Sequence, residues 1–176
     1  MSRFAETRKL DAAEDAASRA INLVPDKGEE FQVCQLHRFL GKIYQSKRDK
    51  EKAINHYKIA LEIGSTSNWH GELFWIHYSL AELFGNEHKF DDANGHIEQA
   101  KSHAVDDVYF LGRLMHIQAL VWYIQRRLED AKSQALHGIE TFEQLGAVRG
   151  VEVCMDLLRK VEEAIKHKSQ STPSQR

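Results

Sequence analysis

A small apolar residue recurs along the chain at intervals of 40, 40 and 38 residues. The recurring positions are Ala13, Ala53, Ala93 and Ala131. After Ala53 and again after Ala93, a bulky residue follows four positions later and another alanine follows seven positions later. That spacing is the period of one face of an α-helix. The chain is therefore expected to be an internal repeat of helical units.

Each repeat contains a second helix. Twelve residues before each of the last three alanines lies another small residue, followed three positions later by a bulky one. These pairs are Gly41 with Tyr44, Ala81 with Phe84, and Ala119 with Trp122. Small residues let two antiparallel helices cross closely, and one helix pair cannot bury its apolar face without a neighbouring pair. We therefore predict an all-α fold, an α-solenoid of antiparallel helix pairs with about eight helices.

The run Leu40-Gly41-Lys42-Ile43-Tyr44, followed by Ala53, Tyr57 and Ala60, resembles the tetratricopeptide repeat motif. The resemblance extends over residues 12–165 and implies a right-handed superhelix. The chain departs from the family pattern in its longer period and in the helix-ending proline, which is present only as Pro25.

The repeat register predicts a single domain over residues 1–167 and a disordered polar tail over residues 168–176. The expected elements are an orphan helix at 3–23, helix pairs at 29–63, 70–103 and 107–145, and a capping helix at 148–167.

The first helix aligns with the second helix of a repeat, so we expect the chain to be the C-terminal part of a longer protein. The segments 130–135, 142–147 and 154–158 resemble the last repeats of arrays attached to fungal receptor ATPases of the NB-ARC or NACHT type. This resemblance implies that the array senses a signal or scaffolds a partner for a nucleotide-dependent switch.

Composition narrows the classes of partner. The 26 acidic and 24 basic residues give a net charge of −2 and are spread along the chain, so we expect no nucleic-acid partner. No segment approaches the roughly 18 to 20 apolar residues that span a bilayer, so we expect no membrane partner. Cys34 and Cys154 lie in apolar segments and the N-terminus is polar, which favours a reduced, cytoplasmic protein.

Motifs for catalysis are missing from the sequence. It contains no Gly-x-x-x-x-Gly-Lys phosphate loop, no nucleophile elbow and no Cys-x-x-Cys, so we expect neither enzymatic activity nor a cofactor. Two histidine pairs recur with the repeat, His37 with His77 and His56 with His96. Repeat-equivalent residues lie about 10 Å apart, too far to share a metal, so we interpret them as structural or surface residues.

The tetratricopeptide resemblance implies that the first helix of each pair lines a concave groove. The candidate groove residues are Arg38, Lys42, Trp75, Tyr78, Glu82, Arg113, His116, Tyr123 and Arg159. A protein or peptide would bury apolar surface on the aromatic rings, with Arg or Lys pairing a carboxylate. The alternative is that these side chains form ordinary solvated helix faces. Glu82 would repel the chaperone C-terminal carboxylates that some members of the family bind.

Two functions follow as hypotheses. The first is a protein- or peptide-binding scaffold without catalytic activity. The second is a structural module that self-associates through its N-terminal helix, because an uncapped solenoid end would expose apolar surface.

Overall fold

The computed structural model describes residues 3–24, 29–104 and 106–171, and over these residues it contains helices and no strand. The elements are α1 (Arg3–Leu23), α2 (Glu30–Lys47), α3 (Lys50–Thr66), α4 (His70–Asn86), α5 (Phe90–His103), α6 (Val108–Ile124), α7 (Leu128–Gln144) and α8 (Val148–Ser171). The expected all-α fold of eight helices is confirmed.

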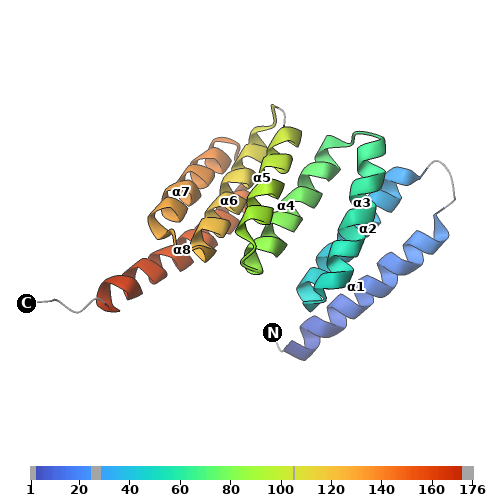
Figure 1. Ribbon diagram of the computed structural model, residues 1–176, viewed down its shortest axis with the longest axis horizontal. Helices are drawn as coiled ribbons and strands as arrows, with labels where there is room; N and C mark the ends of the chain where they lie inside the picture. Colours follow the sequence, from blue (N-terminus) through green and yellow to red (C-terminus); the bar gives the residue numbers. More distant parts are fainter. Residues whose placement is uncertain (1–2, 25–28, 105, 172–176) are drawn as a thin grey trace, which may run out of the picture.

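The helices stack as consecutive pairs along one long axis. The closely packed pairs are α2 with α3, α4 with α5, and α6 with α7, while α1 packs on α2 and α8 lies along α7. The first helices of neighbouring pairs also contact one another, α2 with α4, α4 with α6, and α6 with α8. Figure 1 shows the result, an elongated array with α1 at one end and α7 and α8 at the other. None of these helices, over the residues described, is long and apolar enough to cross a membrane.

Helix bounds agree with the predicted ones to within three residues, except at the C-terminus. There α8 continues to Ser171, so residues 168–171, predicted as part of the tail, are helical. The last turn carries Lys168, whose charge interacts favourably with the helix dipole, and the sequence from Val148 to Ser171 contains no proline. The rest of the predicted tail, residues 172–176, and the Pro25 turn lie outside the described residues.

Every described turn between helices contains one residue in the left-handed backbone region. These residues are Arg48, Asn68, His88, Asp106, Arg126 and Gly146, with φ between 54° and 65°. A left-handed residue after the last helical residue ends a helix while satisfying its final carbonyl groups. Aspartates then cap the N-termini of some of the next helices. Asp107, for example, accepts hydrogen bonds from the backbone amides of Tyr109 and Phe110. The turns are therefore short and nearly uniform, which keeps the pairs in register.

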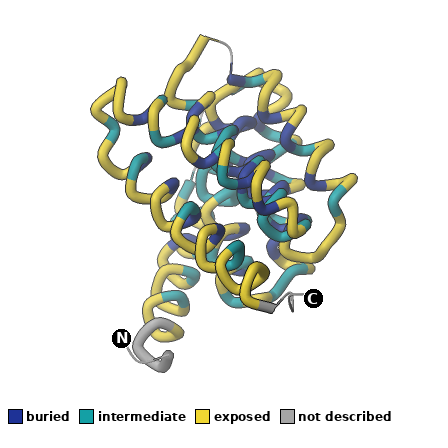
Figure 2. The backbone as a smooth tube through the Cα atoms, turned by 90° about the vertical axis from the view of Figure 1, so that its left-hand side faces the viewer, coloured by how far each residue is buried: buried dark blue, intermediate teal, exposed yellow. Residues whose placement is uncertain are grey.

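The predicted small residues of the three helix pairs lie at helix crossings and are buried, whereas Ala13 of α1 is exposed. Ala53, Ala81, Ala93 and Ala131 are fully buried, and Figure 2 shows buried positions concentrated on the inner side of the stack. A Cβ added at Gly41 would lie 2.5 Å from Cε1 of the Tyr57 ring, closer than any carbon contact allows. The α2–α3 crossing therefore requires glycine on one helix because the other contributes a tyrosine.

The second and third helix pairs differ in which of their two helices contributes a phenylalanine to the core. In the second pair, Phe74 on α4 belongs to the same core as Ala104. In the third pair, Gly112 on α6 faces Phe142 on α7, and a Cβ on Gly112 would lie 2.8 Å from that ring. Phe142 also packs against Gly150 of α8. The bulky side chain has thus moved from the first helix to the second, where it joins α7 to both neighbours.

Candidate functional site

The candidate site residues lie on α2, α4, α6 and α8, and we call the surface that these helices share the first-helix face. At its N-terminal end, Arg38 of α2 pairs with Glu72 of α4, with 2.6 Å between Nε and Oε2. The other carboxylate oxygen of Glu72 accepts a hydrogen bond from Gln35 at 2.8 Å. Glu72 is buried and fully engaged, so it holds α4 against α2 and leaves little of Arg38 for a partner.

A second ion pair crosses the same two helices further along. Lys42 of α2 lies 2.5 Å from Oε2 of Glu82 on α4, and both side chains keep part of their surface exposed. Glu82, which was predicted to repel a carboxylate ligand, therefore has an ion-pair partner within the chain. An exposed pair of this kind contributes at most about 1 kcal/mol and can exchange for contacts with a ligand.

The centre of the face carries Trp75 and Tyr78 from α4 with Arg113 and His116 from α6, which we call the central cluster. The Arg113 guanidinium carbon lies 5.2 Å from the centre of the Trp75 ring and 4.8 Å from that of Tyr78. These distances are within the range of cation–π attraction. Four of the nine predicted residues are therefore brought into direct contact.

Hydrogen bonds link Arg113, Tyr78 and His116 within the central cluster. Nη2 of Arg113 donates to the Tyr78 hydroxyl at 3.0 Å, and that hydroxyl lies 2.6 Å from Nδ1 of His116. The hydroxyl can donate onward only if this nitrogen carries no proton. Burial, reinforced by the positive charge of Arg113, lowers the pKa of His116 to about 4 and so favours that neutral ring. Burial also raises the pKa of Tyr78, which stays a phenol.

Exposure separates the members of the central cluster. Tyr78 is only 5% exposed, so it offers almost no surface to a partner, contrary to the role expected for it. Trp75 and Arg113 are half-buried. The Nε atom of Arg113 is buried and has no hydrogen-bond acceptor among the described residues. A buried donor without an acceptor is unusual in a native structure.

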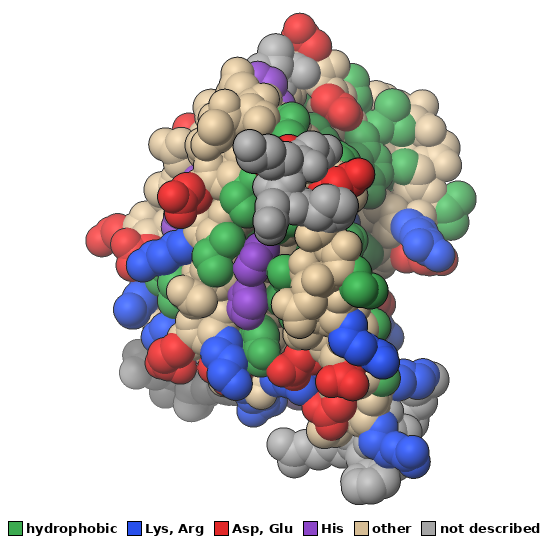
Figure 3. All heavy atoms as spheres, turned by 90° about the vertical axis from the view of Figure 1, so that its right-hand side faces the viewer, with side chains coloured by type: hydrophobic (Ala, Val, Ile, Leu, Met, Phe, Trp, Pro, Cys, Tyr) green, Lys and Arg blue, Asp and Glu red, His purple; other side chains and the backbone are tan. Residues whose placement is uncertain are grey.

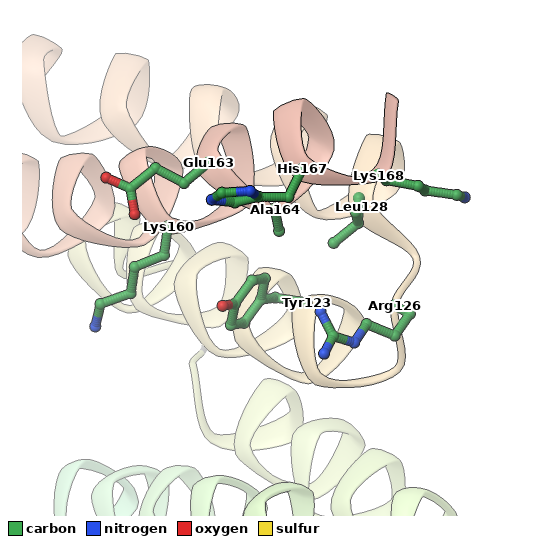
Figure 4. Close-up of a pocket in the computed structure, with 8 residues that line it drawn as sticks. All are labelled: Tyr123, Arg126, Leu128, Lys160, Glu163, Ala164, His167 and Lys168. Carbon is green, nitrogen blue, oxygen red and sulfur yellow. The ribbon is translucent and has the colours of Figure 1, made fainter. Parts of the chain in front are cut away.

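The last two candidates lie apart from the cluster. Tyr123 lines a separate pocket between the ends of α6 and α8, drawn in Figure 4. Arg159 is exposed on α8 and pairs with Asp156 one turn earlier, with 3.0 Å between Nη2 and Oδ1. The structure therefore does not unite the nine residues into one site.

Two histidine pairs were missed by comparing only repeat-equivalent positions. His37 of α2 meets His56 of α3, and His77 of α4 meets His96 of α5, each with 2.9 Å between the two Nδ1 atoms. Each pair spans 19 residues, and that repeated spacing was the available signal. A neutral ring donates to its neutral partner in such a pair, consistent with the pKa of each histidine being lowered by burial.

Both cysteines, Cys34 and Cys154, are free and buried. Burial raises the pKa of both Cys34 and Cys154 to about 11, so neither thiol is an ionised nucleophile near neutral pH. No group of three or more histidine, cysteine or acidic side chains among the described residues is arranged to hold a metal ion.

The outer side of α1 bears on the self-association hypothesis. Between Thr7 and Leu23 the exposed side chains are mostly charged or small, and Leu23 is the exposed large apolar one. Figure 3 shows acidic and basic side chains interspersed with apolar ones at this end of the molecule. The exposed residues between Thr7 and Leu23 form no apolar patch that would favour self-association. Self-association through this helix stays a prediction.

Comparisons with known proteins return a structural likeness. No protein-family model matches the chain, and no curated protein matches it in sequence. Among solved structures, the chain resembles the crystal structure of BtubC (BKLC) from P. vanneervenii with a TM-score of 0.65 and 15% sequence identity. The match covers 97% of this chain and 79% of that one. At this identity the likeness shows that the helical array is shared.

Proposed function

We propose that the chain is a tetratricopeptide-type scaffold that binds a protein or peptide on its first-helix face and has no catalytic activity. The observation that carries the proposal is the half-buried pair of Arg113 and Trp75, in which the guanidinium carbon lies 5.2 Å from the centre of the indole ring. A partner carboxylate or carbonyl oxygen would accept a hydrogen bond from the part of Arg113 that is exposed.

The surroundings of Arg113 suit such a contact. Trp75 packs edge-on against Phe110 and Tyr78, with ring centres 5.9 Å and 5.6 Å away, so the indole is held in place before binding. Rigid aromatic side chains lose little entropy on binding, and Trp and Arg are the residues that most often dominate interface energies. Tyr78 and His116 act as supports because they orient Arg113 from beneath.

A capture experiment with matched variants tests the proposal. The bait is the full chain, the test variant carries Trp75→Ala with Arg113→Ala, and the control variant carries Glu98→Ala with Lys101→Ala. The control residues form an exposed ion pair on α5, away from the cluster. Partners identified by mass spectrometry are then titrated as purified proteins against each bait by calorimetry.

We expect at least one partner to bind the unmodified chain and the control variant equally and to lose most of its affinity for the test variant. Circular dichroism of both variants checks that the helices persist. Equal recovery of every partner by the test and control variants would reject the central cluster as the binding site.

The larger receptor expected from residues 130–158 supplies a biological setting for this scaffold. In such a receptor the array would hold the signal or partner and a nucleotide-dependent domain would switch. The coding sequence upstream of this chain tests that setting, because a receptor of this kind requires a phosphate-binding loop there.

A further inference from the structure

The same corner of the array occurs three times, where a first helix ends beside the last turns of the next first helix. We call these corners the end pockets. The first contains Arg48 and Lys50 opposite Glu87, and it encloses about 420 Å³. Lys50 crosses it to Glu87, with 2.6 Å between Nζ and Oε2. This ion pair occupies part of the first end pocket and leaves its lining at a net charge of +1, from Arg48.

Apolar side chains fill the second corner. Gly85 near the end of α4 faces α6, and a Cβ added there would meet Val121 at 3.2 Å and Ile124 at 3.8 Å. Neither of these side chains offers a charge to a ligand, so this corner serves helix packing.

The third end pocket is both open and cationic. It encloses about 550 Å³, within the usual size range of ligand sites. Its lining residues are Tyr123, Arg126, Leu128, Lys160, Glu163, Ala164, His167 and Lys168. Figure 4 shows Tyr123 and Arg126 on the α6 side, facing Ala164 and His167 on α8. The three cationic side chains, Arg126, Lys160 and Lys168, and the single carboxylate, Glu163, together contribute a net charge of +2 to the lining.

The excess charge comes from α8, which contributes Lys160 and Lys168 but only one carboxylate, that of Glu163. Arg126 lies 78 residues after Arg48 and has the same left-handed backbone, with φ values of 65° and 64°. Leu128 lies 78 residues after Lys50, so the cation that crosses the first pocket is replaced by a leucine. Neither Arg126 nor Lys160 has an ion-pair partner among the described residues.

Lys160 of the third end pocket acts electrostatically on the central cluster. Burial and Arg113 lower the pKa of His116, and the positive charge of Lys160 adds to that lowering. Lys160 is therefore within electrostatic reach of the central cluster on the same face, so one extended partner can contact both.

We propose that the third end pocket binds an acidic segment of a partner protein. Its carboxylates pair with Arg126 and Lys160, and an adjoining apolar side chain packs on the half-buried Tyr123. The inference rests on the proposed function and adds to it the chemical character of the partner and the place where its acidic segment lies. The complement of a positive, partly apolar pocket is a negative, partly apolar peptide.

The test uses two fluorescein-labelled peptides that differ only in charge, Glu-Asp-Glu-Leu-Asp-Glu and Gln-Asn-Gln-Leu-Asn-Gln. Fluorescence anisotropy measures their binding to the full chain. The test variant carries Arg126→Asn with Lys160→Gln, because asparagine tolerates the left-handed backbone of that turn and glutamine is a good helix former. The control variant carries Arg48→Asn, the equivalent change in the less cationic first end pocket, which the Lys50–Glu87 ion pair partly fills.

We expect the acidic peptide to bind, the amide peptide to bind at least about tenfold more weakly, and added salt to weaken the acidic peptide. The test variant should lose about tenfold or more in affinity for the acidic peptide, and Arg48→Asn should change it by less than about twofold. Failure of the unmodified chain to bind the acidic peptide would overturn the inference. Equal binding of the two peptides, or equal affinity in the test and control variants, would overturn it too.

The two proposals fail separately. If the capture experiment assigns a partner to the central cluster while the acidic peptide does not bind, the proposed function stands and this inference is wrong. If the acidic peptide binds but Trp75→Ala with Arg113→Ala removes that binding and the pocket variant does not, the anion site is Arg113, and the third end pocket is rejected.

Discussion

Acidification should destabilise the array through the histidine pair of its second repeat. His77 is buried, and burial together with the neighbouring His96 and His103 lowers its pKa from 6.5 to about 4. The unfolded chain therefore binds a proton that the folded chain excludes between those two values. Stability from this group is fully present above pH 6.5 and is lost as the pH falls toward 4.

The size of the destabilisation follows from the shift in the pKa of His77. A difference of one pKa unit corresponds to about 1.4 kcal/mol, so His77 should cost about 2.5 kcal/mol of unfolding free energy between pH 7.5 and pH 4.5. The geometry agrees with the sign. One proton can enter the His77–His96 pair without breaking its hydrogen bond, but a second would place two cationic rings 2.9 Å apart at their Nδ1 atoms.

The third repeat supplies the control variant. Met115 and Gln134 lie 38 residues after His77 and His96, so His77→Met with His96→Gln transplants a pair that the fold already accepts. Urea unfolding followed by circular dichroism at pH 7.5 and pH 4.5 gives the free energies of both proteins. We expect the variant to lose at least about 2 kcal/mol less than the unmodified chain on acidification. The reasoning is refuted if both proteins lose the same amount.

Three further predictions concern two packing contacts and one buried ion pair. Gly41→Ala should lower the unfolding free energy by about 1–3 kcal/mol because its Cβ would collide with the Tyr57 ring, and the midpoint of thermal unfolding reports it. Gly95→Ala is the matched control, since nothing lies within 4 Å of its added Cβ, and it should stabilise the chain by about 0.5–1 kcal/mol; a loss in both would contradict this account. Phe142→Ala should cost about 3–5 kcal/mol in urea unfolding because the ring joins α7 to α6 and α8, and a loss below about 1 kcal/mol would show that those helices do not depend on it. Glu72→Ala should cost about 3 kcal/mol, since it leaves a mostly buried arginine unpaired, and an unchanged chemical denaturation curve would disprove that role.

Much of the helical framework was readable from spacing alone. The period of small residues located Gly41, Ala81 and Ala119 at helix crossings, and all three are buried. Helix periodicity is a local property of the chain, so the order and bounds of the helices followed from it. The end of α8 was misplaced because a polar composition does not distinguish a disordered tail from an exposed helical turn.

The candidate site was readable only in part. The sequence placed four residues of the central cluster on the first-helix face: Trp75, Tyr78, Arg113 and His116. It did not predict which of them are half-buried anchors and which are buried supports. Tyr78 is buried because Arg113 and His116 of the next first helix close over it. Glu72, the partner of Arg38, escaped notice because nothing in its local sequence marks it as buried.

The sequence by itself determined where helices form and which small residues lie at their crossings, since both depend on the 3.6-residue period and on side-chain size. The tertiary structure alone decided which polar groups meet across helices. These contacts depend on how packed helices are rotated and shifted relative to one another. Bulky residues such as Phe142 set that rotation and shift by packing against glycines of neighbouring helices. The same packing left Arg113 with an unpaired donor and the third end pocket with its charge unbalanced.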